Sequence, residues 1–183
     1  MTSAIGIGSG DVVTFWREAG PEKWFKKDAA FDGVIADRFG DLHAEAATGN
    51  LADWASTPEG ALALVLLLDQ FSRNLHRGSP QAFAQDERAL EIARNAIDAG
   101  LDQAVPPELR AFFFLPFMHS ERIADQERCV ALCHAHAPFN LLYALEHERI
   151  IRRFGRFPHR NAVLCRTMSA AEQAFMDGGG FAG

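Results

Sequence analysis

The sequence has few cysteines, no long apolar run and no recognisable leader segment. Its three cysteines, Cys129, Cys133 and Cys165, are an odd number and too few for a disulfide framework, which favours a reducing compartment. No window reaches the roughly 18 continuous apolar residues that a membrane helix needs. The opening residues MTSAIGIGSGDVV lack the basic and apolar regions of a secretion signal. We therefore expect a cytoplasmic protein without a membrane segment.

Motifs typical of several enzyme classes are missing as well. Cys129, Cys133, His134 and His136 include no CxxC pair and lie on one segment, whereas zinc sites draw four ligands from separate elements. The glycine-rich GIGSG lacks the strand and downstream acid of a dinucleotide-binding fingerprint, and neither a P-loop lysine motif nor a GxSxG motif is present. The sequence thus predicts no metal and no cofactor, and it leaves open whether the protein is an enzyme.

Glycine and proline together account for only 23 of the 183 residues, while 48% of the residues are hydrophobic. Such a composition argues against disorder and low complexity and suits one soluble domain with its own core. No linker divides the chain. We therefore predict a single domain over residues 1–183, with flexible ends at residues 1–10 and 178–183.

The net charge of −6 hides a strong local asymmetry. Between Arg149 and Arg166 there are six arginines and no lysine, aspartate or glutamate, so this stretch carries +6 and the rest of the chain −12. Guanidinium groups bind carboxylate or phosphate in a planar, bidentate way and tolerate partial burial. The stretch is either paired to internal carboxylates or part of an anion site. The acidic average argues against nucleic acid as a partner.

Helical spacing with start and stop signals recurs along the chain, and no stretch alternates apolar and polar residues. Asp28 and Thr57 are typical N-cap residues, whereas Gly40 and Gly49 are typical helix ends. Pro116 falls inside an apolar helix and should kink it. The pattern predicts an all-α fold, an array of antiparallel helical hairpins. Its later helices are expected at about 58–74, 80–99, 121–136, 138–154, 160–166 and 169–176.

The segment ALALVLLLDQFSRNLHR, residues 61–77, is apolar on every side over its first eight residues, which indicates a helix surrounded by protein. Asp69 and Arg73 follow on the same face as its leucines, and Gln70 and Asn74 form a second pair four residues apart. An unpaired buried charge costs several kcal/mol. These side chains therefore either pair with one another and with nearby loops or belong to a site.

Two other helices break an apolar face in the same way. In FNLLYALEHERIIRRFG, Glu146 and His147 interrupt a face of aromatic and aliphatic residues. In LRAFFFLPFMHSE, the proline kink redirects His119 and Glu121. Both groups are either a satisfied buried network or members of a pocket.

The connection RFGRFPHRN places Arg156 and His159 on a tight turn between two helices. Successive backbone amides near His159 to Asn161, at the start of the following helix, would favour an anion. This turn lies inside the arginine-rich stretch. It is therefore a candidate position for an anionic ligand, with pairing of its arginines to internal carboxylates as the alternative.

Four long motifs stand out: FWREAGPEKWFKKDAAFD, LDQFSRNLHRGSPQAFAQDERAL, RAFFFLPFMHSE and HERIIRRFGRFPHRN. Together they resemble a bacterial family of uncharacterised all-helical proteins, a domain of unknown function, over about residues 13–175. The resemblance implies a right-handed, tetratricopeptide-like array of hairpins and offers no catalytic assignment. It also implies a glycine where this chain has Cys165. The matching positions are Asp69, Gln70, Arg73, Asn74, Arg77, Asp86, Pro116, His119, Ser120, Glu121, His147, Arg153, Gly155, Arg156, Pro158, His159, Arg160 and Asn161.

Our leading hypothesis is that polar residues from distant helices converge on one pocket for an anionic small molecule or a peptide carboxylate. Arginines would bind the anion bidentately. If any chemistry occurs, His119 or His147 would transfer protons, with Glu121 or Glu146 as the orienting partner. One alternative is a tetratricopeptide-like module that binds a protein. The other is a purely structural polar network. The candidate ligand-binding residues are Asp69, Arg73, Asn74, His119, Glu121, His147, Arg153, Arg156, His159 and Arg160.

Overall fold

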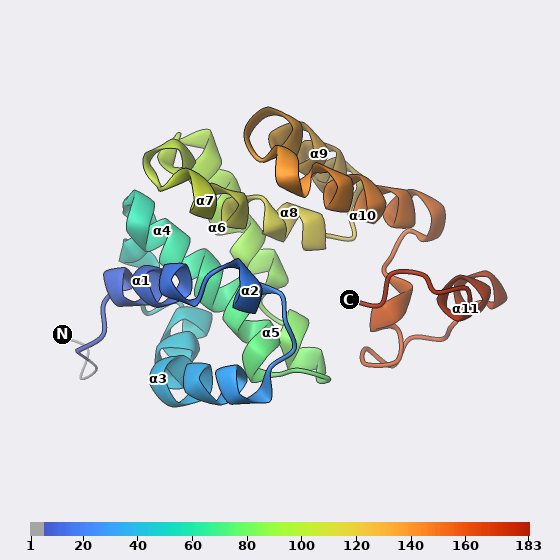
Figure 1. Cartoon of the computed structure of the whole chain (residues 1–183), viewed down its shortest axis with the longest axis horizontal. Helices are drawn as coiled ribbons and strands as arrows, with labels where there is room; N and C mark the ends of the chain where they lie inside the picture. Colours follow the sequence, from blue (N-terminus) through green and yellow to red (C-terminus); the bar gives the residue numbers. More distant parts are fainter. Residues whose placement is uncertain (1–5) are drawn as a thin grey trace.

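The computed structural model describes residues 6–183, which fold into helices and turns without a strand (Figure 1). This confirms the predicted all-α class, whereas the tetratricopeptide-like arrangement stays a prediction. Of the N-terminal end that we expected to be flexible, residues 1–5 lie outside the described residues. Ser9 and Gly10 already belong to the first helix.

The α-helices are α1 (Ser9–Ala19), α2 (Pro21–Trp24), α3 (Ala29–Thr48), α4 (Pro58–Val65), α5 (Ser72–Leu75), α6 (Asp86–Asp98), α7 (Pro107–Arg110), α8 (Leu115–His119), α9 (Ile123–His136), α10 (Leu141–Phe154) and α11 (Ala170–Asp177). Short tight turns of helix connect them: η1 (Ala52–Ser56), η3 (Pro80–Phe83), η4 (Leu101–Ala104), η5 (Ala111–Phe113), η6 (Pro138–Asn140) and η7 (Pro158–Arg160). A π-helical turn, η2 (Leu66–Phe71), joins α4 to α5 without a break.

The caps explain where several helices begin and end. The carboxylate of Asp28 accepts hydrogen bonds from the first amides of α3, and the Thr57 hydroxyl accepts one from Gly60 at the start of α4. Gly49 ends α3 in the left-handed conformation, with φ of 91°. These three sequence predictions are confirmed.

Three of the expected helices differ from the structure. The helix expected at 80–99 is divided into η3 and α6 by a turn at residues 84 and 85. The helix that begins after Asp28 does not end at Gly40 but continues to Thr48, because the apolar face of Phe39 and Leu42 stays in phase across the glycine. One glycine inside a helix costs only about 1 kcal/mol, which this burial offsets. The helix expected at 160–166 is replaced by η7 and a series of turns.

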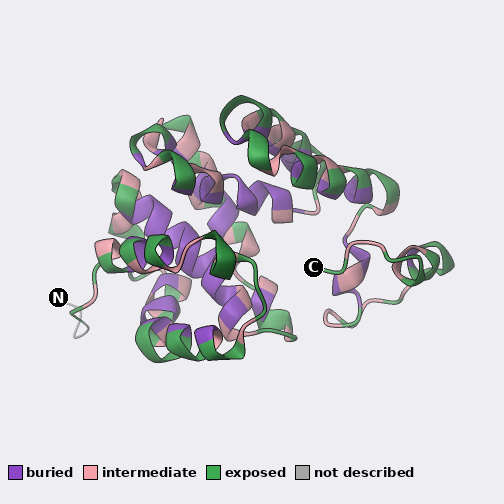
Figure 2. Cartoon of the chain, viewed as in Figure 1, coloured by how far each residue is buried: buried purple, intermediate pink, exposed green. Residues whose placement is uncertain are grey.

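The main core surrounds the run of α4, η2 and α5, whose residues are almost all buried (Figure 2). Helices α1 and α6 pack against α4, and α3 packs against η2 and α5. The expectation of a helix enclosed by protein is therefore confirmed. The polar residues that follow its apolar part face the interior of the molecule.

Pro116 lies in the first turn of α8, which follows the aromatic run Phe112–Phe114, so the expected break occurs next to the proline. Helix α8 ends at His119, close under the hairpin of α9 and α10. Beyond α10 the chain turns through Gly155 and η7 and forms α11. Figure 1 shows the C-terminus returning to the middle of the molecule, between α11 and the green helices. These turns bring residues near 69, 119 and 160 together.

Candidate functional site

The carboxylate of Asp69 is fully buried at the π-helical turn and accepts hydrogen bonds from several side chains. Nδ1 of His119 donates to Oδ1 over 2.7 Å, and the amide of Gln70 donates to Oδ2 over 2.6 Å. The guanidinium of Arg73 lies 3.1 Å from Oδ1. Single π-helical turns often occur at functional sites, and this one carries the most deeply buried acid of the cluster.

The protonation states in this pair follow from its surroundings. Burial acts to raise the pKa of Asp69, but the charge of Arg73 and the hydrogen bonds of its partners outweigh it and keep the pKa lowered. For His119, burial and Arg73 lower the pKa, although Asp69 partly opposes them. Asp69 is therefore ionised and His119 neutral at pH 7, and the bond from Nδ1 leaves Nε2 of His119 as the free nitrogen.

Asp86 connects two arginines of the same cluster. It receives a bidentate pair of hydrogen bonds from Arg73, of 3.0 and 3.2 Å, and a single bond of 3.2 Å from Arg160. Both guanidinium groups lie over the ring of Phe83, at 5.6 Å for Arg73 and 4.5 Å for Arg160. Asp69, Arg73, Asp86, His119 and Arg160 are called the central cluster below.

Arg160 is the least compensated member of the central cluster. Its side chain is 7% exposed, yet its one ion pair within the described residues is the 3.2 Å contact with Asp86. Its Nε is buried without a hydrogen-bond partner. Burial lowers the pKa of Arg160 to about 10, with Asp86 opposing the shift and Arg73 adding to it. The guanidinium stays charged at neutral pH and retains donors for a further anion.

Two more histidines border the central cluster. Nδ1 of His147 lies 2.7 Å from the carbonyl of Tyr143 and donates to it, which leaves Nε2 free. Nδ1 of His159 is buried and has no partner. Burial lowers the pKa of His147 to about 4, and burial together with the charge of Arg160 lowers that of His159 to about 3. Both rings are therefore neutral at pH 7.

Glu121 binds residues that precede and follow η7 in the chain. Its carboxylate accepts a bidentate pair of hydrogen bonds from Arg166, of 2.7 and 3.0 Å, and a bond of 2.8 Å from the backbone amide of Phe157. Burial acts to raise its pKa, but these hydrogen bonds keep the pKa lowered. Glu121 thus fixes the turn that carries His159 and Arg160.

The remaining candidates lie elsewhere. The amide of the buried Asn74 donates to Asp32 over 2.8 Å, and Asp32 also accepts a hydrogen bond from Arg77. Arg156 forms a bidentate pair with Glu172, at 2.6 and 2.8 Å. Arg153 lies over the ring of Phe154, with 4.7 Å between guanidinium and ring centre. The structure therefore does not bring these three residues to the central cluster.

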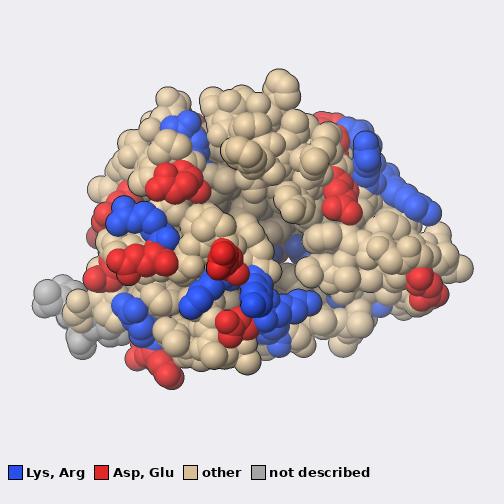
Figure 3. Space-filling view, in the orientation of Figure 1, with Lys and Arg blue, Asp and Glu red and all other residues tan. Residues whose placement is uncertain are grey.

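Solvent reaches the central cluster from one side. The side chains of Arg73, Asp86 and His119 are 21%, 16% and 17% exposed. Figure 3 shows a hollow in the middle of the molecular face, with positively charged atoms at its floor. A separate open groove of about 600 Å³ lies along α6, between Arg88 and Arg122, and contains none of the candidate residues. Within residues 6–183, no three His, Cys, Asp or Glu side chains are placed to hold a metal ion.

Sequence reasoning left Asp86, Phe83 and Arg166 out of the candidate site. The family resemblance includes Asp86 and could have identified it. The pattern of its own helix, however, does not indicate that its side chain faces the interior. Phe83 lies on a short turn and contributes through the face of its ring, which no motif encodes. Arg166 was visible as the end of the arginine-rich stretch, without any sign that Glu121 was its partner.

The fold and the site together define an all-helical protein with a partly open cluster of ion pairs and neutral histidines. Residues 12–180 match the family described as bacterial protein of unknown function, DUF924, and the chain belongs to that family. A solved structure of a protein of unknown function from Agrobacterium tumefaciens is 48% identical, with a TM-score of 0.90 over 93% of this chain and 97% of the other. No curated protein matches. No helix in the described part of the chain is long and apolar enough to span a membrane.

Proposed function

We propose that the central cluster binds a small anionic ligand through a carboxylate or phosphate group. The observation that supports this most directly is the pair of unpartnered buried nitrogens, Nε of Arg160 and Nδ1 of His159, on adjacent residues of η7. Buried polar groups are nearly always hydrogen-bonded, so such an orphan needs an explanation. An anion in the neighbouring hollow would accept these hydrogen bonds and compensate the buried charge of Arg160.

The neutral histidines suit such a ligand. Because His119 is oriented by Asp69, its free Nε2 would accept a proton from a bound group or return one. Asp69 holds the ring as an orienting carboxylate does, a role that sequence reasoning gave to Glu121 or Glu146. This arrangement is compatible with proton transfer.

Isothermal titration calorimetry with inorganic phosphate and with acetate tests the proposal. The key variant is Arg160→Gln, which removes the charge and most of the donors, and we expect it to weaken binding at least about tenfold, as removal of a charged hydrogen bond does. Arg153→Gln is the matched control, since this arginine is exposed and lies outside the central cluster. It should leave the dissociation constant unchanged.

His119→Asn provides a second variant in case Arg160→Gln impairs folding, which circular dichroism will show. It keeps one amide donor toward Asp69 but removes Nε2. Binding that is equal in the wild type, Arg160→Gln and His119→Asn would reject the proposal, as would an absence of binding by the wild type. Either result would favour a network whose role is structural.

A protein-binding role is the second candidate, because one surface favours it. Phe139 in η6 and Leu142 and Tyr143 in the first turn of α10 are 94%, 78% and 59% exposed. Neighbouring exposed apolar side chains often mark interaction sites. A saturable protein partner whose binding is lost in Leu142→Asp would support this role. We further propose a cytoplasmic location, in keeping with the three free thiols.

A further inference from the structure

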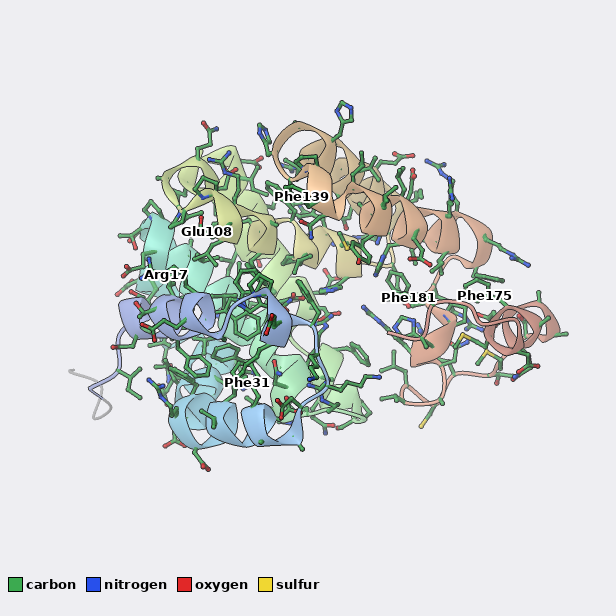
Figure 4. All side chains as sticks on the ribbon, in the orientation of Figure 1. Arg17, Phe31, Glu108, Phe139, Phe175 and Phe181 are labelled. Carbon is green, nitrogen blue, oxygen red and sulfur yellow. The ribbon has the colours of Figure 1, made fainter. Side chains whose placement is uncertain are left out.

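The C-terminal tail, residues 178–183, lies across the two histidines that border the central cluster. The ring centre of Phe181 is 4.5 Å from that of His147 and 5.2 Å from that of His159, with both pairs close to edge-on. In Figure 4 Phe181 points to the inner side of η7, whereas Phe175 lies farther out on α11. A Cβ added to Gly183 would approach the His159 ring to 3.0 Å. The tail therefore fits closely against the histidines.

The attachment of the tail is weak. Its first three residues are glycines, and Gly179 has φ of 80°, a conformation that favours glycine. The amide of Gly180 donates to the carbonyl of Phe175, but beyond it, no backbone hydrogen bond is found for residues 181–183 with the described residues. Phe181 itself is only partly buried. Packing of the Phe181 ring and of the small glycines, rather than backbone hydrogen bonds, thus holds the last three residues of the tail.

The space filled by the Phe181 ring adjoins His159, and the ring of Phe157 connects His159 to Arg160. The ring of Phe157 is 5.5 Å from His147 and also 5.5 Å from His159, and the guanidinium of Arg160 lies 4.7 Å from the centre of Phe157. An aromatic group in place of Phe181 would therefore be next to His159, and only the ring of Phe157 would separate it from Arg160. Neighbouring side chains would thus contact both the apolar part and the anionic group of one small ligand.

We propose that Phe181 occupies a subsite for an aromatic ring, and that the ligand of the central cluster is an aryl carboxylate or aryl phosphate. Its ring displaces Phe181 from between His147 and His159 while its anionic group binds Arg160. The inference rests on the proposed function and names the ligand class. The tail acts as an internal competitor, which leaves the subsite when the ligand enters.

Titration with phenyl phosphate and with inorganic phosphate, in the wild type and in Phe181→Ala, tests the inference. Removing the competing ring should strengthen phenyl phosphate binding about tenfold, the order expected for one aromatic side chain released from burial. Inorganic phosphate should bind the two proteins equally, because it does not use the subsite. Phenol, which has the ring but no charge, should bind far more weakly than phenyl phosphate.

Phe154→Ala is the matched control, since Phe154 belongs to the same small apolar cluster but packs on Phe175 rather than on the histidines. It should change neither affinity. If phenyl phosphate and inorganic phosphate bind equally well, before and after Phe181→Ala, the aryl subsite is rejected and the anion site stands. If neither ligand binds any variant, the proposed function is rejected as well.

The proton signals of the histidines provide a second test, which does not depend on a difference in binding affinity. The ring current of Phe181 should shift the imidazole proton signals of His147 and His159, and Phe181→Ala should remove that shift. Phenyl phosphate added to the wild type should move the same signals, whereas inorganic phosphate should not move those of His147. Signals unaffected by Phe181→Ala would show that the tail does not cover the histidines and would overturn the inference.

Discussion

The body of the molecule, α1 to α10, and its C-terminal segment, residues 155–183, are held by different forces. The body encloses a large continuous core of buried aliphatic and aromatic side chains. The C-terminal segment contributes only Phe157 as a fully buried large apolar side chain, and three of its five buried residues are polar: Arg160, Asn161 and Glu172. Ion pairs with the body, such as Arg160 with Asp86 and Arg166 with Glu121, attach it instead.

This difference explains where the candidate site lies. Apolar packing is non-directional and tolerates many arrangements, whereas ion pairs fix the position of each partner. The central cluster forms at the boundary, where Arg160 of the C-terminal segment meets the partly buried carboxylate of Asp86 in the body. A polar boundary of this kind can exchange an internal partner for a ligand, which a close-packed core cannot do.

The largest effect should come from the charge buried within the body. Asp69→Ala removes the acceptor of His119 and of Gln70 and leaves Arg73 with one carboxylate, so we expect a loss of about 3–5 kcal/mol in the free energy of unfolding. Urea denaturation followed by circular dichroism measures it. Asp98→Ala removes an exposed ion pair with Arg128 and should cost less than about 1 kcal/mol. Equal losses of unfolding free energy in the two variants would show that the central cluster stabilises the fold no more than an exposed ion pair does.

The same contrast between apolar packing and ion pairs explains which of the two regions could be predicted from the sequence. Helical periodicity and caps such as Asp28 and Thr57 located the helices of the body, because apolar burial leaves a regular pattern. The pattern failed at residues 160–166, where the backbone follows the bonds of Arg166 and Glu121 rather than a repeating face. Pairing between distant charges, as in Asp86 with Arg160, leaves no local trace in a single sequence.

An intermediate effect is expected from acid, through the histidines that the C-terminal segment covers. The pKa of His147 is lowered to about 4 in the folded protein, against about 6.5 when unfolded. Below pH 6.5 the unfolded chain therefore binds the proton more readily, and stability falls as the pH drops toward 4. At pH 5 this one group should cost about 2 kcal/mol relative to pH 7.

Denaturation curves at pH 7 and pH 5 measure this loss. His147→Gln removes the titrating group and should reduce the difference between the two curves, whereas His134→Gln, at an exposed position, should not. His43 lies in the body and its pKa is likewise lowered to about 4 by burial and by His76, so a part of the acid sensitivity should remain. A His147→Gln protein as acid-sensitive as the wild type would show that His147 does not contribute to the loss of stability in acid.

The smallest effect concerns the backbone of the C-terminal segment. Cys165 has φ of 52°, and it is the one non-glycine residue with positive φ in the described part of the chain. This conformation costs an L-residue about 1–2 kcal/mol relative to glycine, which explains why the family resemblance implies glycine here. Cys165→Gly also gains freedom in the unfolded chain, so the net gain should be about 1 kcal/mol, or roughly 2–4 °C in Tm.

Cys165→Ala separates the backbone from the thiol in this experiment. It removes the sulfur but keeps the Cβ that is strained at positive φ, so calorimetry should find its Tm close to that of the wild type. If alanine raises the Tm as much as glycine does, the thiol rather than the backbone is unfavourable at this position. If glycine alone raises it, then the turns that replace the expected helix at 160–166 are held in a strained conformation by the surrounding ion pairs, which distinguishes this segment from the body with its regular, capped helices.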